Sequence, residues 1–572
     1  MSEENKRLTI LSVVFLLSAL VLTAKLFALQ IIQYDYYSTL ALSSHEIYKK
    51  IHPRRGQIFF RDARSGAEYP AAVNAKEYLV YAVPAEIEKE KVMEIADNLT
   101  GVLSLKEEEK TVIVGKISKE NDPYEALAKK VSEEKMDELK SLDLPGIYFT
   151  PEDRRFYPEG NLAANVLGFY GFNNQGNPTG SYGIEGFWEK ELAGQSGLLL
   201  GERGALGSWI ALAGRTTMEA ENGADLTLTI DRALQYQACE RLRQGFKEYQ
   251  AKSASLVMMD PRTGAILAMC SLPDFNPNNY SQASGAAVYN NTAIFTPYEP
   301  GSVFKPITMS IGLDLELVTP NTIFTDPCVR KIAGFEIKNA QDKCYGTVSM
   351  SSVLENSINT GAMWVEEKIG ADRFKRYVEK FGFGQKTGLG LDTEAPGDIR
   401  SLSNKGEIWG AVGSFGQGFM ATPLQMAVAY SALANGGELL KPYIVAEMRW
   451  PNGRIERTKP EMIERVISDR ASKLVTGMLV SVVESGHSKG SQIGNYYLAG
   501  KTGTAQIAGK GGYTEETNHT FAGFGPAGST PRVVLVIKYE EPNRPWADAT
   551  AGPVFKDVMK FALSYLGAPR ER

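Results

Sequence analysis

The second half of the sequence predicts an α+β fold built around one antiparallel sheet. Two strand-like runs, at 255–259 and 265–271, are joined by an Asp-Pro-Arg-Thr-Gly hairpin signature. Three more strand candidates occur near the C-terminus, at 497–507, 519–525 and 532–539. The pattern between these two groups is mainly helical. Hairpin-joined strands at both ends of a helical middle favour an antiparallel sheet covered by helices.

Length and composition limit the number of domains and the class of protein. The chain has 572 residues, so two or three domains are expected. Its 43% hydrophobic and 23% charged residues are typical of a globular protein, and a net charge of −5 gives no reason to expect a nucleic-acid partner. Four cysteines and four histidines show no metal-ligand spacing, which argues against a metal site.

Residues 8–32 form an apolar stretch long enough to cross a bilayer as a helix. Lys6 and Arg7 precede it and should stay in the cytoplasm, so residues 1–7 are predicted to be a cytoplasmic tail. A cleaved signal peptide is the alternative, but the run is longer than a usual signal core and no small-x-small cleavage site follows. We therefore expect an uncleaved anchor, with everything after about Gln33 outside the cytoplasmic membrane.

Residues 33–222 are expected to form a mixed domain whose composition shows no catalytic cluster. It should begin with a helix over 34–50 that leaves the membrane, followed by short strands such as 78–83. Residues 85–145 are rich in Glu and Lys with periodic apolar positions, which predicts surface helices. The α+β domain should then occupy 223–572.

A turn followed by an apolar helix brings Ser302 and Lys305 together. Pro300 and Gly301 interrupt the preceding segment, and the apolar run after them is typical of the start of a buried helix. Lys305 lies three residues after Ser302, about one turn along the same helix face. A serine hydroxyl is a poor nucleophile until a base takes its proton, and a neutral amine in this position can do so.

Two further motifs follow in chain order. Ser357-Ile358-Asn359 is a Ser-x-Asn triplet, and residues two apart do not share a helix face, so a loop is expected there, permitted by Thr360-Gly361. Lys501-Thr502-Gly503-Thr504 lies in a run that predicts an interior strand. The glycine in that strand would let another backbone come close.

Each of two motifs has a second copy, and we interpret both copies as structural. Ser132 and Lys135 repeat the Ser-x-x-Lys spacing in a stretch whose charges predict a solvated helix face. Lys386-Thr387-Gly388 repeats the Lys-Thr-Gly triplet in a loop-like segment with no strand pattern behind it, which indicates a turn.

With Ser-x-x-Lys, Ser-x-Asn and Lys-Thr-Gly in this order, the sequence resembles the penicillin-binding protein and serine β-lactamase superfamily. Further segments resemble the class B penicillin-binding proteins: 298–301, 500–506, 521–524, Arg55-Gly56-x-Ile58, Arg155-x-Tyr157-Pro158 and Gly183-Ile184-Glu185. The resemblance runs from the anchor to the last helix. It implies a penicillin-binding transpeptidase domain after a non-catalytic pedestal or dimerisation-like domain. It also implies a membrane-anchored peptidoglycan D,D-transpeptidase that needs no metal or organic cofactor.

The resemblance implies a role for the first two motifs. Ser302 would attack the carbonyl of the penultimate D-alanine of a donor stem peptide and release the terminal D-alanine. Lys305 would be the base, because burial and the like charge of Lys501 lower its pKa toward a neutral amine. Ser357 would pass a proton to the leaving group, and Asn359 would orient Lys305 and the substrate backbone.

The third motif would bind the substrate. Thr502, Thr504 and Lys501 would hold the terminal carboxylate, on a strand that Gly503 opens to a close neighbour. The backbone N–H groups of Ser302 and Thr504 would form an oxyanion hole, typically worth a few kcal/mol of barrier lowering. An amine of a second stem peptide would then take the acyl group, and β-lactam antibiotics would acylate the same serine.

Other functions share these motifs. A D,D-carboxypeptidase or β-lactamase would hydrolyse the acyl-serine, although neither needs the anchor or the preceding domain. A non-enzymatic scaffold of the wall-building machinery is disfavoured by the intact motifs. Within class B, the compact first half and the moderate motif spacings favour a division-type, septal enzyme over an elongation-type, side-wall enzyme. Its usual partner is a polytopic membrane glycosyltransferase.

The four cysteines give two different expectations. Cys328 and Cys344 bracket a polar segment in which 335–337 could form a short strand that folds the ends back toward each other. An oxidising compartment would permit a disulfide, worth on the order of 3 kcal/mol in the chain-entropy model. Two unpaired thiols are the open alternative. Cys239 and Cys270 lie in helix-like and strand-like runs and are expected to be core thiols.

Overall fold

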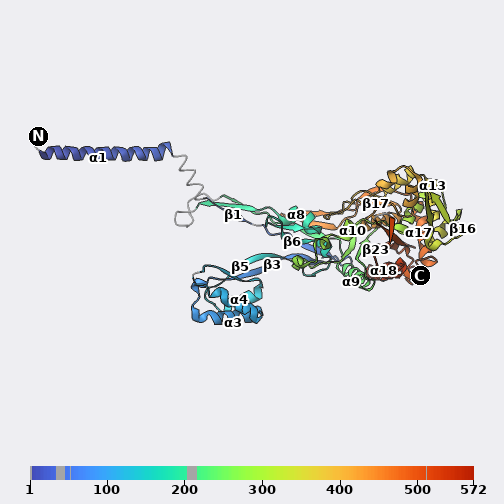
Figure 1. Cartoon of the computed structure of the whole chain (residues 1–572), viewed down its shortest axis with the longest axis horizontal. Coiled ribbons are helices and arrows are strands. Elements are labelled where there is room, and N and C mark those ends of the chain that lie inside the picture. Colours follow the sequence, from blue (N-terminus) through green and yellow to red (C-terminus); the bar gives the residue numbers. More distant parts are fainter. Residues whose placement is uncertain (1–2, 34–45, 52, 121, 203–215, 510–511) are drawn as a thin grey trace. The chain divides into compact units, whose positions relative to one another are not determined.

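The computed structural model describes residues 3–33, 46–51, 53–120, 122–202, 216–509 and 512–572 (Figure 1). These residues divide into two compact units. The first is drawn from residues 1–54 and 193–223, and the second from 55–192 and 224–572. The expected domain boundary between residues 222 and 223 stays a prediction.

The first unit contains the apolar N-terminal helix. α1 spans Glu3–Phe27 and continues through a π-helical turn, Ala28–Ile32. The stretch Leu11–Ile31 has 21 residues and a mean hydropathy of 2.2, and it is not buried. By length and composition it can cross a membrane, which fits a single-pass membrane protein.

A small sheet completes the first unit and corrects one expectation. β1 (Glu46–Ile51) pairs antiparallel with β8 (Gly197–Glu202), which pairs with β9 (Thr216–Met218). The helix expected over 34–50 is therefore wrong for 46–50, and 34–45 lie outside the described residues. A strand partner far along the chain supplies the ladder hydrogen bonds, and such tertiary pairing overrides local propensity.

The second unit begins with a seven-stranded sheet of order β19-β18-β10-β2-β3-β4, with β5 also paired to β3. Within it, β10 and β2 run parallel, while the other neighbours are antiparallel. The strands are β2 (Ile58–Arg61), β3 (Glu68–Ala82), β4 (Glu125–Ser132), β5 (Ile147–Phe156), β10 (Asp225–Leu228), β18 (Val445–Arg449) and β19 (Ile455–Arg457). Segments from both halves of the chain thus build one sheet.

A helical module lies at the β3–β5 end of this sheet. Its helices are α3 (Val92–Leu103), α4 (Glu107–Ile117) and α5 (Glu133–Ser141), which confirms surface helices within 85–145. Their apolar faces share a separate core that includes Leu99 and Ile113. Periodic apolar residues on otherwise charged helices form that core.

The predicted antiparallel sheet is present in the second half of the chain. Its order is β12-β11-β23-β22-β21, and every pair of neighbours is antiparallel. The strands are β11 (Ser253–Met259), β12 (Ile266–Leu272), β21 (Ala499–Gly509), β22 (Gly512–Gly525) and β23 (Val533–Glu540). The α+β prediction is therefore confirmed.

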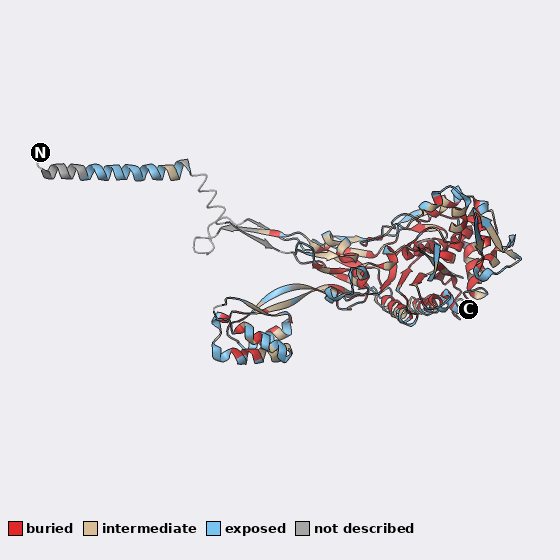
Figure 2. Cartoon of the chain, viewed as in Figure 1, coloured by how far each residue is buried: buried red, intermediate tan, exposed pale blue. Residues whose placement is uncertain are grey.

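The strands of this sheet are largely buried (Figure 2), and apolar residues on both of their faces share cores with helices. On one face, Leu256 and Ile537 share a core with α9 (Arg232–Glu248) and α18 (Ala551–Tyr565). On the other, the neighbouring Val257 and Val536 share a core with the helices of the middle section. Those helices include α11 (Lys305–Asp314), α13 (Asn359–Ile369), α14 (Ala371–Lys380), α16 (Pro423–Ala434) and α17 (Asp469–Glu484).

Short elements connect these layers. The helices are α6 (Ala164–Leu167), α7 (Gly183–Phe187), α8 (Glu189–Ala193), α10 (Thr292–Phe295), α12 (Met350–Glu355) and α15 (Glu407–Gly413). The strands form four two-stranded sheets: β6 (Phe169–Phe172) with β7 (Pro178–Ser181), β13 (Ile323–Thr325) with β16 (Thr347–Ser349), β14 (Val329–Ile332) with β15 (Phe335–Lys338), and β17 (Glu438–Leu440) with β20 (Met462–Arg465).

Three sequence motifs from the first half meet in one buried ionic cluster. The Glu185 carboxylate is fully buried and accepts hydrogen bonds from Arg55 Nε at 2.9 Å and Arg155 Nε at 2.6 Å. The Tyr157 hydroxyl lies 3.2 Å from the same carboxylate, and Arg55 also reaches Glu189 at 2.6 Å. Paired and hydrogen-bonded charges of this kind tolerate burial, so the cluster ties together segments that are distant in sequence.

Candidate active site

Ser302 lies in a tight turn against the edge of the five-stranded sheet. Gly301–Phe304 form a 3-10 turn that leads directly into α11, so the serine lies just before the α-helix. Gly301 has φ +62° and donates its N–H to the carbonyl of Gly416 at 2.8 Å. A side chain at Gly301 would meet Ala505 of β21 at 2.8 Å, which explains why glycine precedes the serine.

Lys305 is the first residue of α11, and its side-chain amine lies among three oxygen acceptors. The residue is 1% exposed. Its Nζ lies 2.7 Å from Asn359 Oδ1, 3.1 Å from Ser357 Oγ and 2.5 Å from the Ser357 carbonyl oxygen. The first two sequence motifs, more than 50 residues apart in the chain, are therefore joined through one amine.

The turn that carries Ser357 is placed differently from the expectation. It occupies the residues between α12 and α13, and Ser357 has φ +55°, a left-handed conformation. The expected loop between two helical runs is therefore present, at residues 356–358. Asn359 is the first residue of α13, and Thr360 and Gly361 are helical, so the expectation that Thr360-Gly361 permits the loop is wrong. A polar residue in a strained turn is common where the turn aims a functional side chain.

Electrostatics favour a neutral Lys305. Burial lowers the pKa of Lys305 well below its ordinary value, and the charge of Lys501 lowers it further. The groups within hydrogen-bond reach are a carbonyl, a hydroxyl and an amide, none of which carries a negative charge to oppose this shift. The arrangement therefore favours a neutral amine, which is the form that can accept a proton.

The third motif lies on β21, beside the turn of Ser302. Lys501 pairs with Ala522 of β22, and its amine is buried, which lowers its pKa to about 8, with the charge of Asp548 opposing the shift. A Cβ on Gly503 would come within 3.1 Å of the Pro300 carbonyl and the Val303 nitrogen. The predicted close approach of another backbone at this glycine is confirmed.

Thr502 and Thr504 flank this glycine on the same strand. Thr504 Oγ accepts a hydrogen bond from the Ala547 N–H at 3.1 Å. All eight predicted site residues therefore lie on three neighbouring elements: the Ser302 turn with the start of α11, the Ser357 turn with the start of α13, and β21.

The two look-alike motifs have structural roles. Ser132 is the N-cap of α5 and accepts the N–H of Lys135 at 3.4 Å. Thr387 donates both its N–H and its hydroxyl to Glu394 at 2.6 Å, which closes a turn around the second Lys-Thr-Gly. Both structural interpretations are confirmed.

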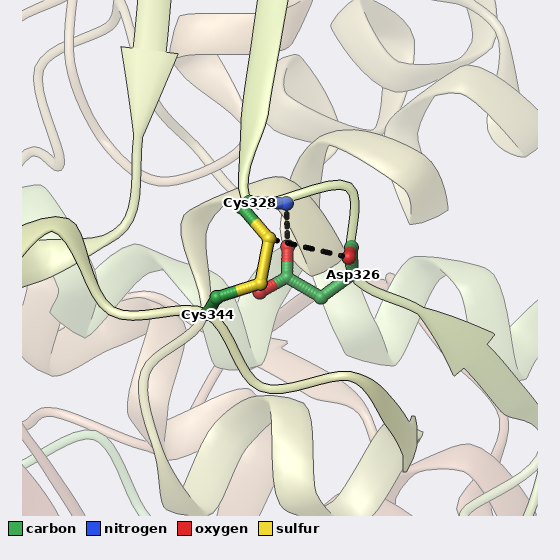
Figure 3. A group of neighbouring side chains, drawn as sticks. All are labelled: Asp326, Cys328 and Cys344. Carbon is green, nitrogen blue, oxygen red and sulfur yellow. Dashed lines mark hydrogen bonds between the residues drawn. A yellow bond between two sulfur atoms is a disulfide. The ribbon is translucent and has the colours of Figure 1, made fainter.

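A further carboxylate, which sequence reasoning missed, holds the Ser357 turn in place. Asp326 accepts a hydrogen bond from the Thr360 hydroxyl at 2.7 Å. It also accepts one from the Cys328 N–H at 2.9 Å (Figure 3). The Asn339 side-chain amide donates a hydrogen bond to Asp326 at 2.8 Å. Its oxygen accepts a hydrogen bond from the Thr360 N–H at 3.2 Å. The segment 326–345 thus supports the start of α13.

Both cysteine pairs form disulfides. Cys328–Cys344 closes the segment that supports α13 (Figure 3), so of the two open alternatives the disulfide is the one present. Cys239–Cys270 joins α9 to β12 with a Cα–Cα distance of 5.6 Å, so the expectation of core thiols is wrong. In the described part of the chain, one group of three potential metal ligands exists: Asp326, Cys328 and Cys344. Its two sulfur atoms are bonded to each other in the disulfide.

Comparisons with known proteins agree with this geometry. Residues 254–560 match the family model described as penicillin binding protein transpeptidase domain, and residues 50–228 match that described as penicillin-binding protein dimerisation domain. Stage V sporulation protein D of Bacillus subtilis is 31% identical over 99% of this chain and 87% of its own length. Peptidoglycan D,D-transpeptidase FtsI of Escherichia coli is 30% identical over 89% of this chain and 83% of its own length.

Solved structures are similar in fold. Penicillin binding protein 2X from Streptococcus thermophilus superposes with a TM-score of 0.77 at 23% identity, over 91% of this chain and 81% of the other. A peptidoglycan synthetase from Bifidobacterium adolescentis has a TM-score of 0.71 at 25% identity, over 92% of this chain and 98% of the other.

Proposed function

The chain belongs to the class B penicillin-binding proteins, and we propose that Ser302 is the nucleophile with which it cross-links peptidoglycan. It is a serine-type peptidoglycan D,D-transpeptidase that binds stem peptides and β-lactams. One observation carries the assignment to Ser302: the buried amine of Lys305, which lies 3.1 Å from Ser357 Oγ and 2.7 Å from Asn359 Oδ1, one turn after the serine.

Acylation begins with a proton transfer. The neutral amine of Lys305 takes the proton of the Ser302 hydroxyl as the oxygen attacks the carbonyl of the penultimate D-alanine. The C–N bond to the terminal D-alanine then breaks. The leaving amine receives its proton from Lys305 through the Ser357 hydroxyl, and Asn359 keeps the lysine in position.

The substrate is held by β21 during this step. Lys501, Thr502 and Thr504 bind the terminal carboxylate of the donor, and the backbone N–H groups of Ser302 and Thr504 stabilise the oxyanion. Gly503 supports this arrangement because it lets the Ser302 turn approach the strand closely. An amine of a second stem peptide then takes the acyl group and frees Ser302.

We further propose a division-type role, with a polytopic membrane glycosyltransferase as partner and the catalytic domain on the extracytoplasmic side. The 30% identity to FtsI, together with the apolar Leu11–Ile31 helix after a basic segment, supports this assignment. The match to stage V sporulation protein D over 99% of this chain favours a second candidate, wall synthesis during sporulation. A fluorescent fusion at the division septum of growing cells supports the first role, whereas a signal restricted to sporulating cells supports the second. A signal along the side wall would favour the elongation type.

The transferase activity itself is tested with purified full-length protein. It is incubated with a stem peptide ending in D-Ala-D-Ala and a primary amine acceptor, and the products are identified by mass spectrometry. A transpeptidase gives an amide between donor and acceptor together with free D-alanine. A hydrolase gives D-alanine and a shortened peptide without the amide, and the Ser302→Ala control should give neither product.

A further inference from the structure

The segment that follows β23 packs against the Lys501-Thr502-Gly503-Thr504 motif of β21. The acylation mechanism proposed for Ser302 gives this segment no role. Its Ala547 N–H donates to Thr504 Oγ at 3.1 Å, which holds the 3-10 turn Ala547–Ala549 against β21. The next residue, Asp548, lies in the same turn and is exposed. Partial burial raises the pKa of its carboxyl, and the charge of nearby Lys501 and the Thr502 side chain oppose that shift. A carboxylate therefore lies beside the three side chains assigned to the substrate carboxylate.

Basic side chains lie around this carboxylate. Asp548 interacts with Lys501 and with His487, whose Nε2 lies 3.2 Å from the Asn356 carbonyl next to the Ser357 turn. His487 is itself acted on by Lys343. The charge of Asp548 opposes the lowering of the Lys501 pKa by burial. A negative group here opposes the donor carboxylate, so it suits a different ligand.

The two half-reactions bring ligands of opposite charge to this place. The donor ends in a carboxylate, and its terminal D-alanine leaves as an amine. The acceptor amine attacks the same acyl carbon and must enter where that amine departed. Primary amines are ammonium ions at neutral pH, so the second ligand arrives as a cation. Trp546, which is 41% exposed on the same segment, offers an apolar surface for the alkyl chain that bears the amine.

We propose that Asp548 binds the ammonium group of the acceptor stem peptide and thereby favours transfer over hydrolysis. The inference rests on the transpeptidase function proposed above. The bound ammonium loses one proton to solvent, and its nitrogen forms the new C–N bond with the acyl carbon. The bond between that carbon and Ser302 Oγ breaks, and the second proton of the amine returns to Ser302 Oγ through Lys305. Asp548 holds the acceptor and takes no covalent part.

The test uses Asp548→Asn in the full-length protein, which keeps the side-chain shape and removes the charge. D-alaninamide, a cationic amine without a carboxylate, is the acceptor, and the ratio of aminolysis to hydrolysis products is measured from one donor peptide. We expect this ratio to fall about tenfold, as for the loss of one charge-assisted hydrogen bond. Acylation by ampicillin should change by less than about twofold, because losing the carboxylate removes a repulsion but also removes its support for the charged form of Lys501. Asp548→Glu should restore most of the ratio.

Asp557→Asn is the matched control, because it removes one carboxylate from α18, where Asp557 pairs with Arg241. It should change neither measurement. An unchanged ratio in Asp548→Asn, or a parallel fall of acylation and aminolysis, would overturn the inference while normal wild-type acylation leaves the proposed function standing. Wild-type protein that forms no acyl-serine would overturn both.

Discussion

Replacing Glu185 by glutamine should destabilise the protein strongly, because this carboxylate is the centre of the buried ionic cluster. Glutamine keeps the shape of the side chain but removes the charge that Arg55 and Arg155 share. Glu185 is 0% exposed, and the Arg155 side chain is 2% exposed. After the change, Arg155 would remain buried with no carboxylate within salt-bridge distance in the described chain, while Arg55 would keep Glu189.

The magnitude follows from the cost of leaving a buried charge unpaired. Removing one partner of a buried ion pair costs about 3–5 kcal/mol. Glu189 offers a matched control, since it contacts the same Arg55 at 2.6 Å but its side chain is 30% exposed. Glu189→Gln should cost only about 1 kcal/mol, as is usual for solvent-screened pairs.

Acid should have the same effect as the mutation. Burial alone would raise the pKa of Glu185, but the charges of Arg155 and Arg55 and their hydrogen bonds hold it below its ordinary value. A group with a depressed pKa stabilises the fold above its unfolded pKa, and that contribution is lost as the pH falls through the folded pKa. Wild-type protein should lose this part of its stability on acidification, and Glu185→Gln should not.

The assay is urea unfolding of the detergent-solubilised protein at neutral pH, followed by circular dichroism. The free energy of unfolding should fall in the order wild type, Glu189→Gln, Glu185→Gln. A Glu185→Gln variant within 1 kcal/mol of the Glu189→Gln variant would refute the reasoning, because it would show that the cluster is not held by this charge.

Three further predictions concern the site, the anchor and the disulfides. Lys501→Ala should slow penicillin acylation at least tenfold, because it removes the cation that binds the carboxylate of the drug. Lys386→Ala should leave the rate unchanged. Equal losses in stopped-flow kinetics would mean that the wrong Lys-Thr-Gly was chosen. Deleting residues 1–32 should give a protein that stays soluble without detergent and still binds fluorescent penicillin; loss of labelling with an intact circular dichroism spectrum would assign the anchor a role in the site. Non-reducing peptide mapping should recover all four cysteines in the two disulfides, and free alkylatable thiols at any of them would contradict the structure.

The parts that sequence predicted correctly depend on local patterns. The strands of the central sheet alternate or run apolar over short, hairpin-joined segments, so their pattern is readable without tertiary information. The Ser-x-x-Lys, Ser-x-Asn and Lys-Thr-Gly motifs are each recognisable within four residues, and their order and local context separate them from the second copies. Lys305, Asn359 and Lys501 could therefore be named in advance, and the structure brings all three motifs together.

The parts that sequence missed depend on partners far along the chain. β1 is a strand because β8 pairs with it, and Cys239 meets Cys270 because α9 crosses β12. The same holds for Asp326 and Asp548, which lie near the site through tertiary packing and belong to no short motif. Such residues are visible only when the fold is known.

The central claim, that Ser302 is the acylated nucleophile, is tested most directly by locating a penicillin adduct. The full-length protein is labelled with a fluorescent penicillin, digested and sequenced by mass spectrometry. The adduct should lie on Ser302 alone, and Ser302→Ala should remain unlabelled while it keeps the wild-type circular dichroism spectrum. An adduct on Ser132 or any other serine, or undiminished labelling of Ser302→Ala, would contradict the account.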